Sequence, residues 1–245
     1  MLDEPFRVWI FNNGHRFEAA EFAILSEEEQ QHSVRLRTEA DRTVFVRTRV
    51  ALRRIIADSI GVSPRDVVFR RNEWGKLVLA GATASDIEFS VSHAKGLSVI
   101  ALAHGRCVGV DIERHRAFPD KLRIAADVFG ADVAVPLSAV DDDVQDYLFL
   151  QMWTAGEAFV KARGTGFAGM NGKVPVSLSR LRPSQSGELP HVILNDRRPG
   201  TIGWTLKHLS LPSGFVGHVV FGELPLTRHQ PSRHEMPASV GRALS

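Results

Sequence analysis

Residues 87–113, IEFSVSHAKGLSVIALAHGRCVGVDIE, decide how this chain is expected to fold. Apolar residues occupy every second position from 87 to 91, which is the pattern of a half-buried strand. The apolar run at 97–103 predicts the next strand, and the turn at 104–106 leads into a third strand at 107–112. The middle of the chain is therefore predicted to be rich in β-structure.

The sequence on both sides of this segment predicts helices as well as strands. Apolar residues at helical spacing predict one long helix at 40–60, ended by Gly61, and another from about 141 to 162. Ser26 before a run of glutamates and a proline near the start of 119–129 predict two shorter helices. Further strands are expected at 6–11, 67–71, 77–80, 174–181, 191–194, 202–209 and 215–221. The expected fold class is α+β.

Each half of the chain offers a long helix followed by several short strands, which favours two similar α+β lobes joined near residue 105. We expect an N-terminal lobe at 1–105 and a C-terminal lobe at 106–225. Residues 226–245 carry prolines, serines and arginines with little periodicity, so we predict a poorly ordered tail there. The two halves share no clear sequence repeat.

Composition narrows the class of protein. The chain has 245 residues, of which 44% are hydrophobic and 24% charged, and this balance argues against a disordered or fibrous protein. Cys107 is the only cysteine, which excludes an intrachain disulfide and a structural cysteine-type zinc site. No secretory signal pattern or apolar run of membrane-span length occurs in the sequence. We therefore expect a cytoplasmic protein without a membrane partner.

Arginines are concentrated in one segment, although the formal net charge is only +2. They are Arg35, Arg37, Arg42, Arg47, Arg49, Arg53, Arg54, Arg65, Arg70 and Arg71. A solvated helical face and a site for a multiply charged anion both fit this clustering. Nucleic acid also fits the charge, but no interleaved aromatic residues or known nucleic-acid motif accompany it, so no such partner is expected.

Asp111 and Glu113 form the first candidate site. Residues two apart on a strand point to the same face, so both carboxylates are expected to project together. Gly109 lies on that face too, where a missing side chain lets a ligand approach the backbone. Magnesium prefers one or two protein carboxylates together with waters and phosphates. An exposed acidic strand beside Arg114 and Arg116 is the alternative interpretation.

Two further segments carry reactive side chains. Glu157 and Lys161 are four residues apart on the second long helix, close to its apolar stripe, and this position favours a functional role. The alternative is an ordinary surface ion pair, which is worth roughly 0.3–0.5 kcal/mol. At 89–93, FSVSH ends a strand in a hydroxyl and an imidazole, Ser92 and His93. A hydrolase site is not favoured, because no Gly-x-Ser-x-Gly nucleophile elbow surrounds Ser92.

Taken in order along the chain, four segments resemble the signature of the surfactin-type phosphopantetheinyl transferases. That signature is a Gly-x-Asp-x-Glu strand followed by Trp/Phe-Ser/Thr/Cys-x-Lys-Glu-Ala/Ser-x-x-Lys. Here it stands as GVDIE at 109–113 and WTAGEAFVK at 153–161. Upstream, FSVSH is similar to the family's Ser-His element, and EWGK at 73–76 to its Gly-Lys turn. The resemblance covers residues 6–221.

The resemblance implies two α+β lobes related by a pseudo-twofold axis, with coenzyme A in the cleft between them. It implies a magnesium-dependent transferase of the holo-acyl-carrier-protein synthase type. Such an enzyme moves the 4′-phosphopantetheine group of coenzyme A to a serine of an apo acyl or peptidyl carrier protein and releases adenosine 3′,5′-bisphosphate. Because one chain contains both walls of the cleft, we expect a monomer.

The resemblance also implies residue roles. The metal ligands would be Asp111, Glu113 and Glu157. Lys161 and His93 would contact phosphates. As catalytic residues we expect these two and Glu157, with Glu157, or a water that it positions on the metal, as the base for the carrier serine. Lys76 and Ser92 would help hold the 3′-phosphate region of coenzyme A. Arg49 and Arg53 also have plausible spacing for contacts with coenzyme A. Arg42 and Val44 compete for the position at which the family has its upstream arginine.

Gly156 departs from the family pattern, which has lysine immediately before the helical glutamate. Glycine inside a helix also costs about 1 kcal/mol relative to alanine. Lys173 or Arg163 could replace the missing charge, or phosphate handling is weaker. Two alternatives follow: a non-catalytic relative that binds coenzyme A or a carrier, and a basic nucleic-acid-binding module.

Overall fold

The computed structural model describes residues 6–81, 86–170, 172–179, 191–195 and 203–223. The predicted tail at 226–245 lies outside these residues. The N-terminal half contains β1 (Phe6–Asn12), α1 (Ala19–Phe22), α2 (Glu27–Val34), α3 (Glu39–Ile60), η1 (Pro64–Asp66), β2 (Phe69–Arg71), β3 (Leu77–Leu79), β4 (Ile87–Ala94) and β5 (Leu97–His104). The C-terminal half contains β6 (Arg106–Arg114), α4 (Lys121–Val128), α5 (Ala131–Ser138), α6 (Asp142–Arg163), η3 (Phe167–Gly169), β7 (Val176–Leu178), β8 (Val192–Leu194), β9 (Trp204–His208) and β10 (Phe215–Glu223).

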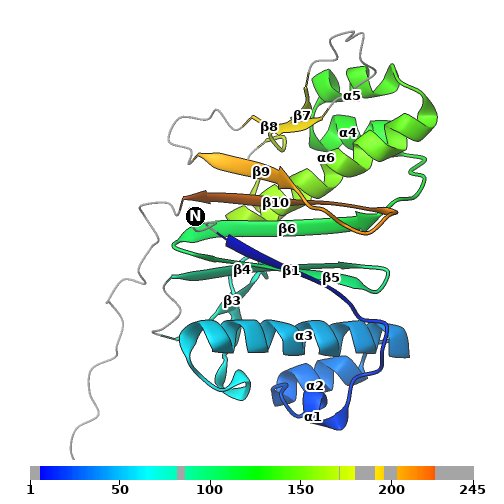
Figure 1. The fold of residues 1–245 in the computed structure, drawn as a ribbon. Helices are drawn as coiled ribbons and strands as arrows, with labels where there is room; N and C mark the ends of the chain where they lie inside the picture. Colours follow the sequence, from blue (N-terminus) through cyan, green and yellow to red (C-terminus); the bar gives the residue numbers. More distant parts are fainter. Residues whose placement is uncertain (1–5, 82–85, 171, 180–190, 196–202, 224–245) are drawn as a thin grey trace, which may run out of the picture.

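The predicted α+β class and the two halves are confirmed. Each half holds a three-stranded antiparallel sheet, in the order β1-β5-β4 in the first and β6-β10-β9 in the second. Helices α1–α3 lie beyond the first sheet and α4–α6 beyond the second, so the sheets occupy the middle of the molecule (Figure 1). The pairs β2-β3 and β7-β8 form separate two-stranded ribbons.

The two long helices begin and end where the sequence predicts. The Thr38 side chain accepts a hydrogen bond from the Asp41 amide at the start of α3, and Gly61 ends the helix in the left-handed conformation. Gly164 ends α6 in the same way. The spacing of apolar residues was a sufficient signal for both helices, and the sequence prediction used a terminating glycine only for α3.

Helix α5 was not predicted, because Pro136 lies inside it and proline disfavours a helix interior. The helix forms because Val133 and Leu137 are buried in the core cluster that α6 supplies with Phe149 and Met152. Tertiary packing therefore overrides the local preference here.

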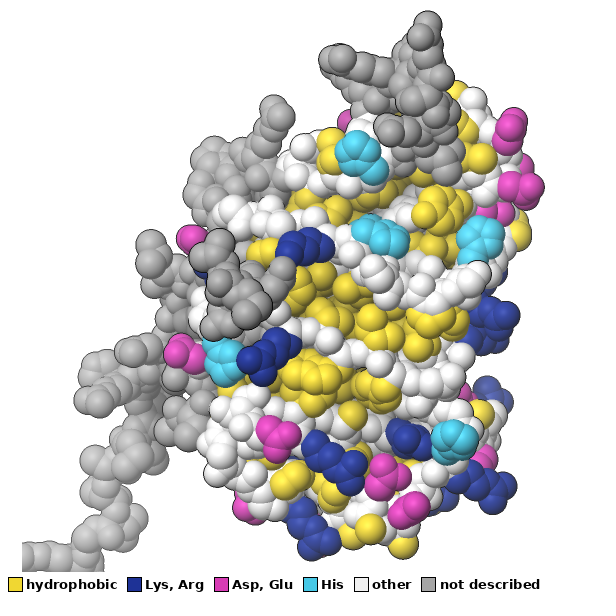
Figure 2. Space-filling model, in the orientation of Figure 1, with side chains coloured by type: hydrophobic (Ala, Val, Ile, Leu, Met, Phe, Trp, Pro, Cys, Tyr) yellow, Lys and Arg dark blue, Asp and Glu magenta, His cyan; other side chains and the backbone are white. Residues whose placement is uncertain are grey.

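Three apolar cores connect these layers. Helix α3 packs against β4 and β5 through Leu52, Ile56, Phe89 and Ile100. Helix α6 packs against the second sheet in the same manner. Between the sheets, alternate residues of β5 face those of β6 and β10, as in Val99, Ala101, Val108, Val110 and Val219. Figure 2 shows apolar side chains across the middle of this face, with charges of both signs over α1–α3.

Gly109 is the place where α6 approaches β6. A Cβ atom at Gly109 would overlap the carbonyl oxygen of Ala158 and the amide nitrogen of Ala162. The expectation that this glycine leaves room for a ligand is therefore wrong, since the helix backbone fills the space. This close approach is what brings α6 against the carboxylate face of β6.

None of the helices within the described residues combines the length and apolarity needed to cross a bilayer.

Candidate active site

The centre of the site is the line along which β4 meets β6. The Ser90 hydroxyl accepts a hydrogen bond from the Val110 amide at 3.0 Å, and the Ser92 hydroxyl accepts one from the Ile112 amide at 3.2 Å. Because the paired positions increase together, the two strands run in the same direction. Their C-terminal ends, at Ala94 and Arg114, therefore lie at the same edge of the molecule.

A recess of about 310 Å³ opens at this edge. It collects all the residues that the sequence suggested for the metal and for catalysis. Its lining is Val91, Ser92, His93, Asp111, Ile112, Glu113, Trp153, Glu157 and Lys161. Strand β4, strand β6 and helix α6 each contribute to it, so the site depends on both halves of the chain.

Asp111 is the most buried acidic group of the recess, with 5% of its surface exposed. Its Oδ1 atom accepts hydrogen bonds from the Lys161 ammonium at 2.6 Å and from the Ser92 hydroxyl at 2.8 Å. Its Oδ2 atom is buried and has no hydrogen-bond partner among the described residues. A buried carboxylate oxygen without a partner is costly, so a cation or a hydrogen-bond donor at this atom would stabilise the recess.

The other two carboxylates also favour a cation. Burial raises the pKa of Glu113, and the nearby Asp111 raises it further. Burial likewise raises the pKa of Glu157; Lys161 opposes this increase, whereas Asp111 and Glu113 add to it. Three carboxylates thus repel one another in a partly desolvated recess.

As the side chains lie, the described part of the chain contains no group of three His, Cys, Asp or Glu residues arranged to hold a metal ion. The donor chemistry still fits a hard divalent cation. Magnesium takes carboxylate oxygens and keeps waters and phosphate oxygens as its other ligands, so a complete cage of protein ligands is not required. The bare Asp111 Oδ2 is the atom best placed to bind it.

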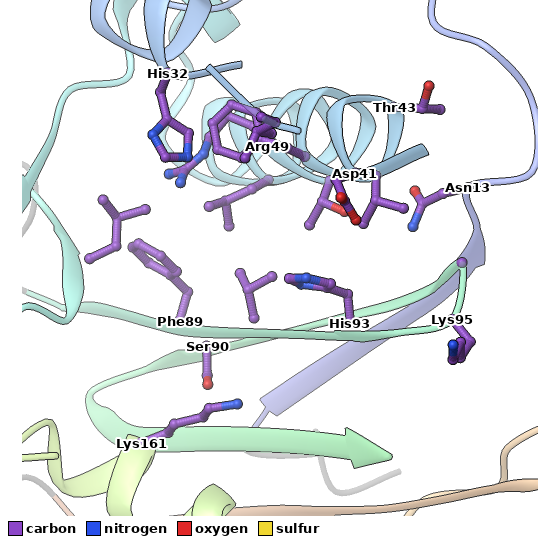
Figure 3. Close-up of a pocket in the computed structure, with 18 of the residues that line it drawn as sticks. Asn13, His32, Asp41, Thr43, Arg49, Phe89, Ser90, His93, Lys95 and Lys161 are labelled. Carbon is purple, nitrogen blue, oxygen red and sulfur yellow. The ribbon is translucent and has the colours of Figure 1, made fainter. Parts of the chain in front are cut away.

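His93 connects the recess with a larger pocket of about 1220 Å³, which lies between α3 and β4. In Figure 3, His93 and Phe89 lie on one side of this pocket, Arg49 and His32 on the other, and Lys161 at its lower edge. Burial lowers the pKa of His93, and the Lys161 ammonium lowers it further. The imidazole is therefore neutral at pH 7 and suited to hydrogen bonding rather than to charge neutralisation.

Arg49 enters the larger pocket from α3. Its guanidinium lies over the Phe45 and Phe69 rings at 5.6 and 5.2 Å, with Glu29 at 3.5 Å. Burial lowers the pKa of Arg49, although Glu29 partly opposes the effect. One nitrogen, Nη1, is buried without a hydrogen-bond partner among the described residues. The pocket therefore presents an unsatisfied cationic donor.

Arg53 does not share this position. Its side chain is 2% exposed, pairs with Glu29 at 2.8 Å and donates to the carbonyl oxygens of Pro64 and Val67. It ties α3 to α2 and to the turn after α3. The expectation that Arg53 contacts coenzyme A is not retained, because its donors are used inside the lobe.

Comparison with known proteins agrees with this geometry. Residues 13–105 match the model described as 4′-phosphopantetheinyl transferase, N-terminal, and residues 107–207 match that of the 4′-phosphopantetheinyl transferase superfamily. The chain belongs to the 4′-phosphopantetheinyl transferase superfamily. The two matches meet between β5 and β6, close to the expected lobe boundary.

Similar proteins bear related names. The 4′-phosphopantetheinyl transferase HetI of Nostoc sp. is 29% identical over 169 residues, which cover 69% of this chain and 71% of HetI. The 4′-phosphopantetheinyl transferase gsp of Aneurinibacillus migulanus is 28% identical over 142 residues, covering 58% and 57%. The L-aminoadipate-semialdehyde dehydrogenase-phosphopantetheinyl transferase of Eremothecium gossypii is 31% identical over 193 residues, covering 75% and 65%. These names do not favour a non-catalytic relative.

Lys76 and Ser92 were predicted to act together in this phosphopantetheinyl transferase, but they face different spaces. Lys76 lines the larger pocket, with its ammonium 3.4 Å from Glu88. Ser92 lines the recess and is bonded to Asp111. The role of Lys76 at the 3′-phosphate stays a prediction, whereas the hydroxyl of Ser92 already has two protein partners.

Gly156 does not face the site. A Cβ atom there would lie 2.9 Å from the Phe129 ring and 3.5 Å from Val174, on the side of α6 that packs against α4. The expected substitutes for the usual lysine, Lys173 and Arg163, are absent from the described lining of both cavities. Lys173 instead donates to the carbonyl oxygen of Asp127.

Asn72 holds the turn that brings Trp74 and Lys76 to the larger pocket, a role that the sequence reasoning missed. Its Oδ1 accepts from the amides of Trp74 and Lys76, and its Nδ2 donates to the Gly164 carbonyl of the other half at 2.8 Å. An asparagine three residues before Gly75 is a local turn signal, so the turn was predictable. The contact across the cleft was not, because it joins residues 92 positions apart.

Proposed function

We propose that this chain transfers the 4′-phosphopantetheine group of coenzyme A to a serine of an apo acyl or peptidyl carrier protein, releasing adenosine 3′,5′-bisphosphate. One observation carries the proposal. The buried Asp111, with its unpartnered Oδ2, lies beside Glu113 and Glu157 in a recess that shares His93, Glu157 and Lys161 with a pocket large enough for a nucleotide.

We assign Asp111, Glu113 and Glu157 to a magnesium ion. When bound, the ion supplies positive charge that offsets the negative charge developing on the pyrophosphate. The protein carboxylates would hold that charge in place, and the pKa values of Glu113 and Glu157 are raised by burial first and by the neighbouring carboxylates second. Lys161 provides a second positive charge, 2.6 Å from Asp111.

The serine hydroxyl of the carrier needs a base to accept its proton. Glu157 is our candidate, because it lines the recess and the pocket alike and its pKa is raised by burial. Attack on the β-phosphorus forms the phosphodiester to the carrier serine, and the bond to adenosine 3′,5′-bisphosphate breaks. Lys161 and His93 bind the phosphate oxygens, the first through charge and the second through a hydrogen bond.

The nucleotide end of coenzyme A is assigned to the larger pocket. Lys76 and Arg49 line it, and the unpartnered Nη1 of Arg49 is a donor suited to a phosphate oxygen. Elsewhere in the arginine-rich segment, Arg42, Arg53 and Arg54 pair with glutamates inside the N-terminal half. Both walls of the pocket come from one chain, which supports the proposal that the protein acts as a monomer. Light scattering at the protein concentrations of the assay tests this proposal.

The direct test is incubation of apo acyl and apo peptidyl carriers with the protein, coenzyme A and magnesium, followed by intact-mass measurement. We expect a mass increase equal to one phosphopantetheine group on the carrier serine. Asp111→Asn keeps the side-chain volume and removes the charge, and should lower the rate by at least about 100-fold, since the metal contributes several kcal/mol.

The matched control is Asp120→Asn, an exposed carboxylate that lines neither cavity among the described residues. It should leave the rate unchanged. Unmodified carriers across the whole panel would rule out the proposed activity. Full activity of Asp111→Asn would instead remove the metal role assigned to this residue.

A further inference from the structure

Ser92 connects the two halves of the molecule through a single hydroxyl group. It lies on β4 in the N-terminal half and is 6% exposed. Its Oγ atom is 3.2 Å from the amide nitrogen of Ile112 and 2.8 Å from Oδ1 of Asp111, both on β6. Ser92 is not among the described residues that line the larger pocket, although the resemblance assigned it to the 3′-phosphate region of coenzyme A.

The chemistry of the partners fixes the direction of both bonds. A backbone amide can only donate, so the Ser92 oxygen must accept from Ile112. An ionised carboxylate can only accept, so the single hydroxyl proton must point to Asp111. The hydroxyl therefore has one defined rotamer, and its proton is committed to the carboxylate.

This bond makes the two oxygens of Asp111 unequal. Oδ1 receives the Ser92 hydroxyl and the Lys161 ammonium, while Oδ2 receives nothing from the described residues and is buried. Rotating the carboxylate to exchange the two oxygens would break both bonds to Oδ1. The bare oxygen is thus held in one orientation, on a side chain that lines the recess together with Glu113 and Glu157.

We propose that Ser92 is a positioning residue that orients Asp111 for the divalent cation, rather than a ligand of the nucleotide. The inference rests on the proposed metal role of Asp111. Hydrogen bonds that orient a ligating carboxylate typically change metal affinity by about 10–100-fold when removed. The same hydroxyl holds β4 to β6, so the orientation of the ligand depends on how the two halves meet.

Ser90 provides a matched control within the same strand. It is similarly buried, at 5%, and its hydroxyl accepts from the Val110 amide in the same way, but among the described residues no carboxylate is bonded to it. Ser90→Ala removes one bond between β4 and β6, whereas Ser92→Ala removes two, the second being the bond to Asp111. Only Ser92→Ala also releases Asp111, so the pair separates an effect on strand pairing from an effect on the carboxylate.

The experiment measures Mn²⁺ binding by electron paramagnetic resonance in the presence of saturating coenzyme A and without a carrier, so that no turnover occurs. Ser92→Ala should weaken Mn²⁺ binding by about tenfold or more. Ser90→Ala should bind as the unmodified protein does, and Ser92→Thr, which keeps the hydroxyl, should restore most of the affinity. Urea unfolding of each variant shows whether both alanine variants lose similar stability.

Ser92→Cys keeps the volume with a weak donor and replaces Ser92→Ala if the latter does not fold; it should show the same weakening. Unchanged Mn²⁺ affinity in Ser92→Ala or Ser92→Cys overturns the inference, and so does an equal loss in Ser90→Ala. If the unmodified protein binds no Mn²⁺, the inference and the metal site both fail. If binding follows the expected pattern but no carrier is modified, only the proposed transferase function fails.

Discussion

At the scale of single residues, the site is a small set of charges arranged around one buried carboxylate. One carboxylate oxygen of Asp111 accepts a hydrogen bond from the Lys161 ammonium, and the other has no hydrogen-bond partner among the described residues. Glu113 and Glu157 have raised pKa values because burial and neighbouring carboxylates oppose their ionised forms. An arrangement of this kind costs stability in the free protein and is compensated when a cation binds.

His218 gives a pH-dependent prediction at the same scale. It is buried opposite Asp111 on β10, is 2.8 Å from the Thr154 hydroxyl, and burial lowers its pKa to about 3. In the unfolded chain its ordinary pKa is 6.5, so between pH 6.5 and 3 the unfolded state binds a proton that the folded state does not. The stability that neutral His218 contributes is therefore present above pH 6.5 and lost as pH falls, by up to about 1.4 kcal/mol per pH unit.

His218→Gln should remove that slope between pH 6.5 and 3, which urea unfolding at a series of pH values measures. The exposed His104→Gln is the control and should leave the slope as it is. A His218→Gln variant whose stability depends on pH as strongly as the original would contradict the assigned burial.

At the scale of elements, the contact between α6 and β6 places the functional groups. Gly109 permits that contact because it has no Cβ, so the backbone of α6 at Ala158 and Ala162 can lie against it. Glu157 and Lys161 then lie on the part of α6 that reaches Asp111. The geometry of the site is therefore set by backbone packing as much as by the charged residues.

Gly109→Ala should test this packing. The added methyl group collides with helix backbone that cannot rotate away, so we expect a loss of about 3 kcal/mol or more in the free energy of unfolding. Gly203→Ala is the control, since a Cβ at Gly203 meets nothing within 4 Å. Denaturant unfolding of the two variants gives the comparison, and equal stabilities would refute the close approach.

The turn between β2 and β3 supplies the second element-scale prediction. Asn72→Ala loses both the turn acceptor and the donor to Gly164, and should raise the KM for coenzyme A about tenfold with little change in kcat, because Lys76 is displaced. Asn72→Asp keeps the acceptor and loses only the donor across the cleft. If Asn72→Asp matches the unmodified enzyme in steady-state kinetics, the bond to Gly164 has no role in binding.

At the scale of the whole molecule, the two halves share a core. Val99 and Ala101 of β5 pack against Val108 and Val110 of β6, and the serine hydroxyls of β4 bond the β6 backbone. Each sheet needs the other to shield the apolar residues of its inner face from water. We therefore expect one cooperative unfolding transition, with calorimetric and van't Hoff enthalpies in agreement.

Differential scanning calorimetry checks this expectation. Two separate transitions would show that the halves fold independently and that the boundary near residue 105 divides autonomous domains. A single transition would mean that the lobes predicted at 1–105 and 106–225 are structural halves of one folding unit.

The sequence by itself determined the two long helices, the central strands and the set of reactive side chains that the structure brings into one recess, because helical periodicity and the spacing of Asp111, Glu113, Glu157 and Lys161 are local signals. Only the tertiary structure decided what depends on contacts distant in the chain. It buried Arg53, turned Gly156 toward Phe129, filled the space at Gly109 with α6 and pointed Ser92 at Asp111. The physical reason is that side-chain direction and burial follow from packing between elements, which no local pattern encodes.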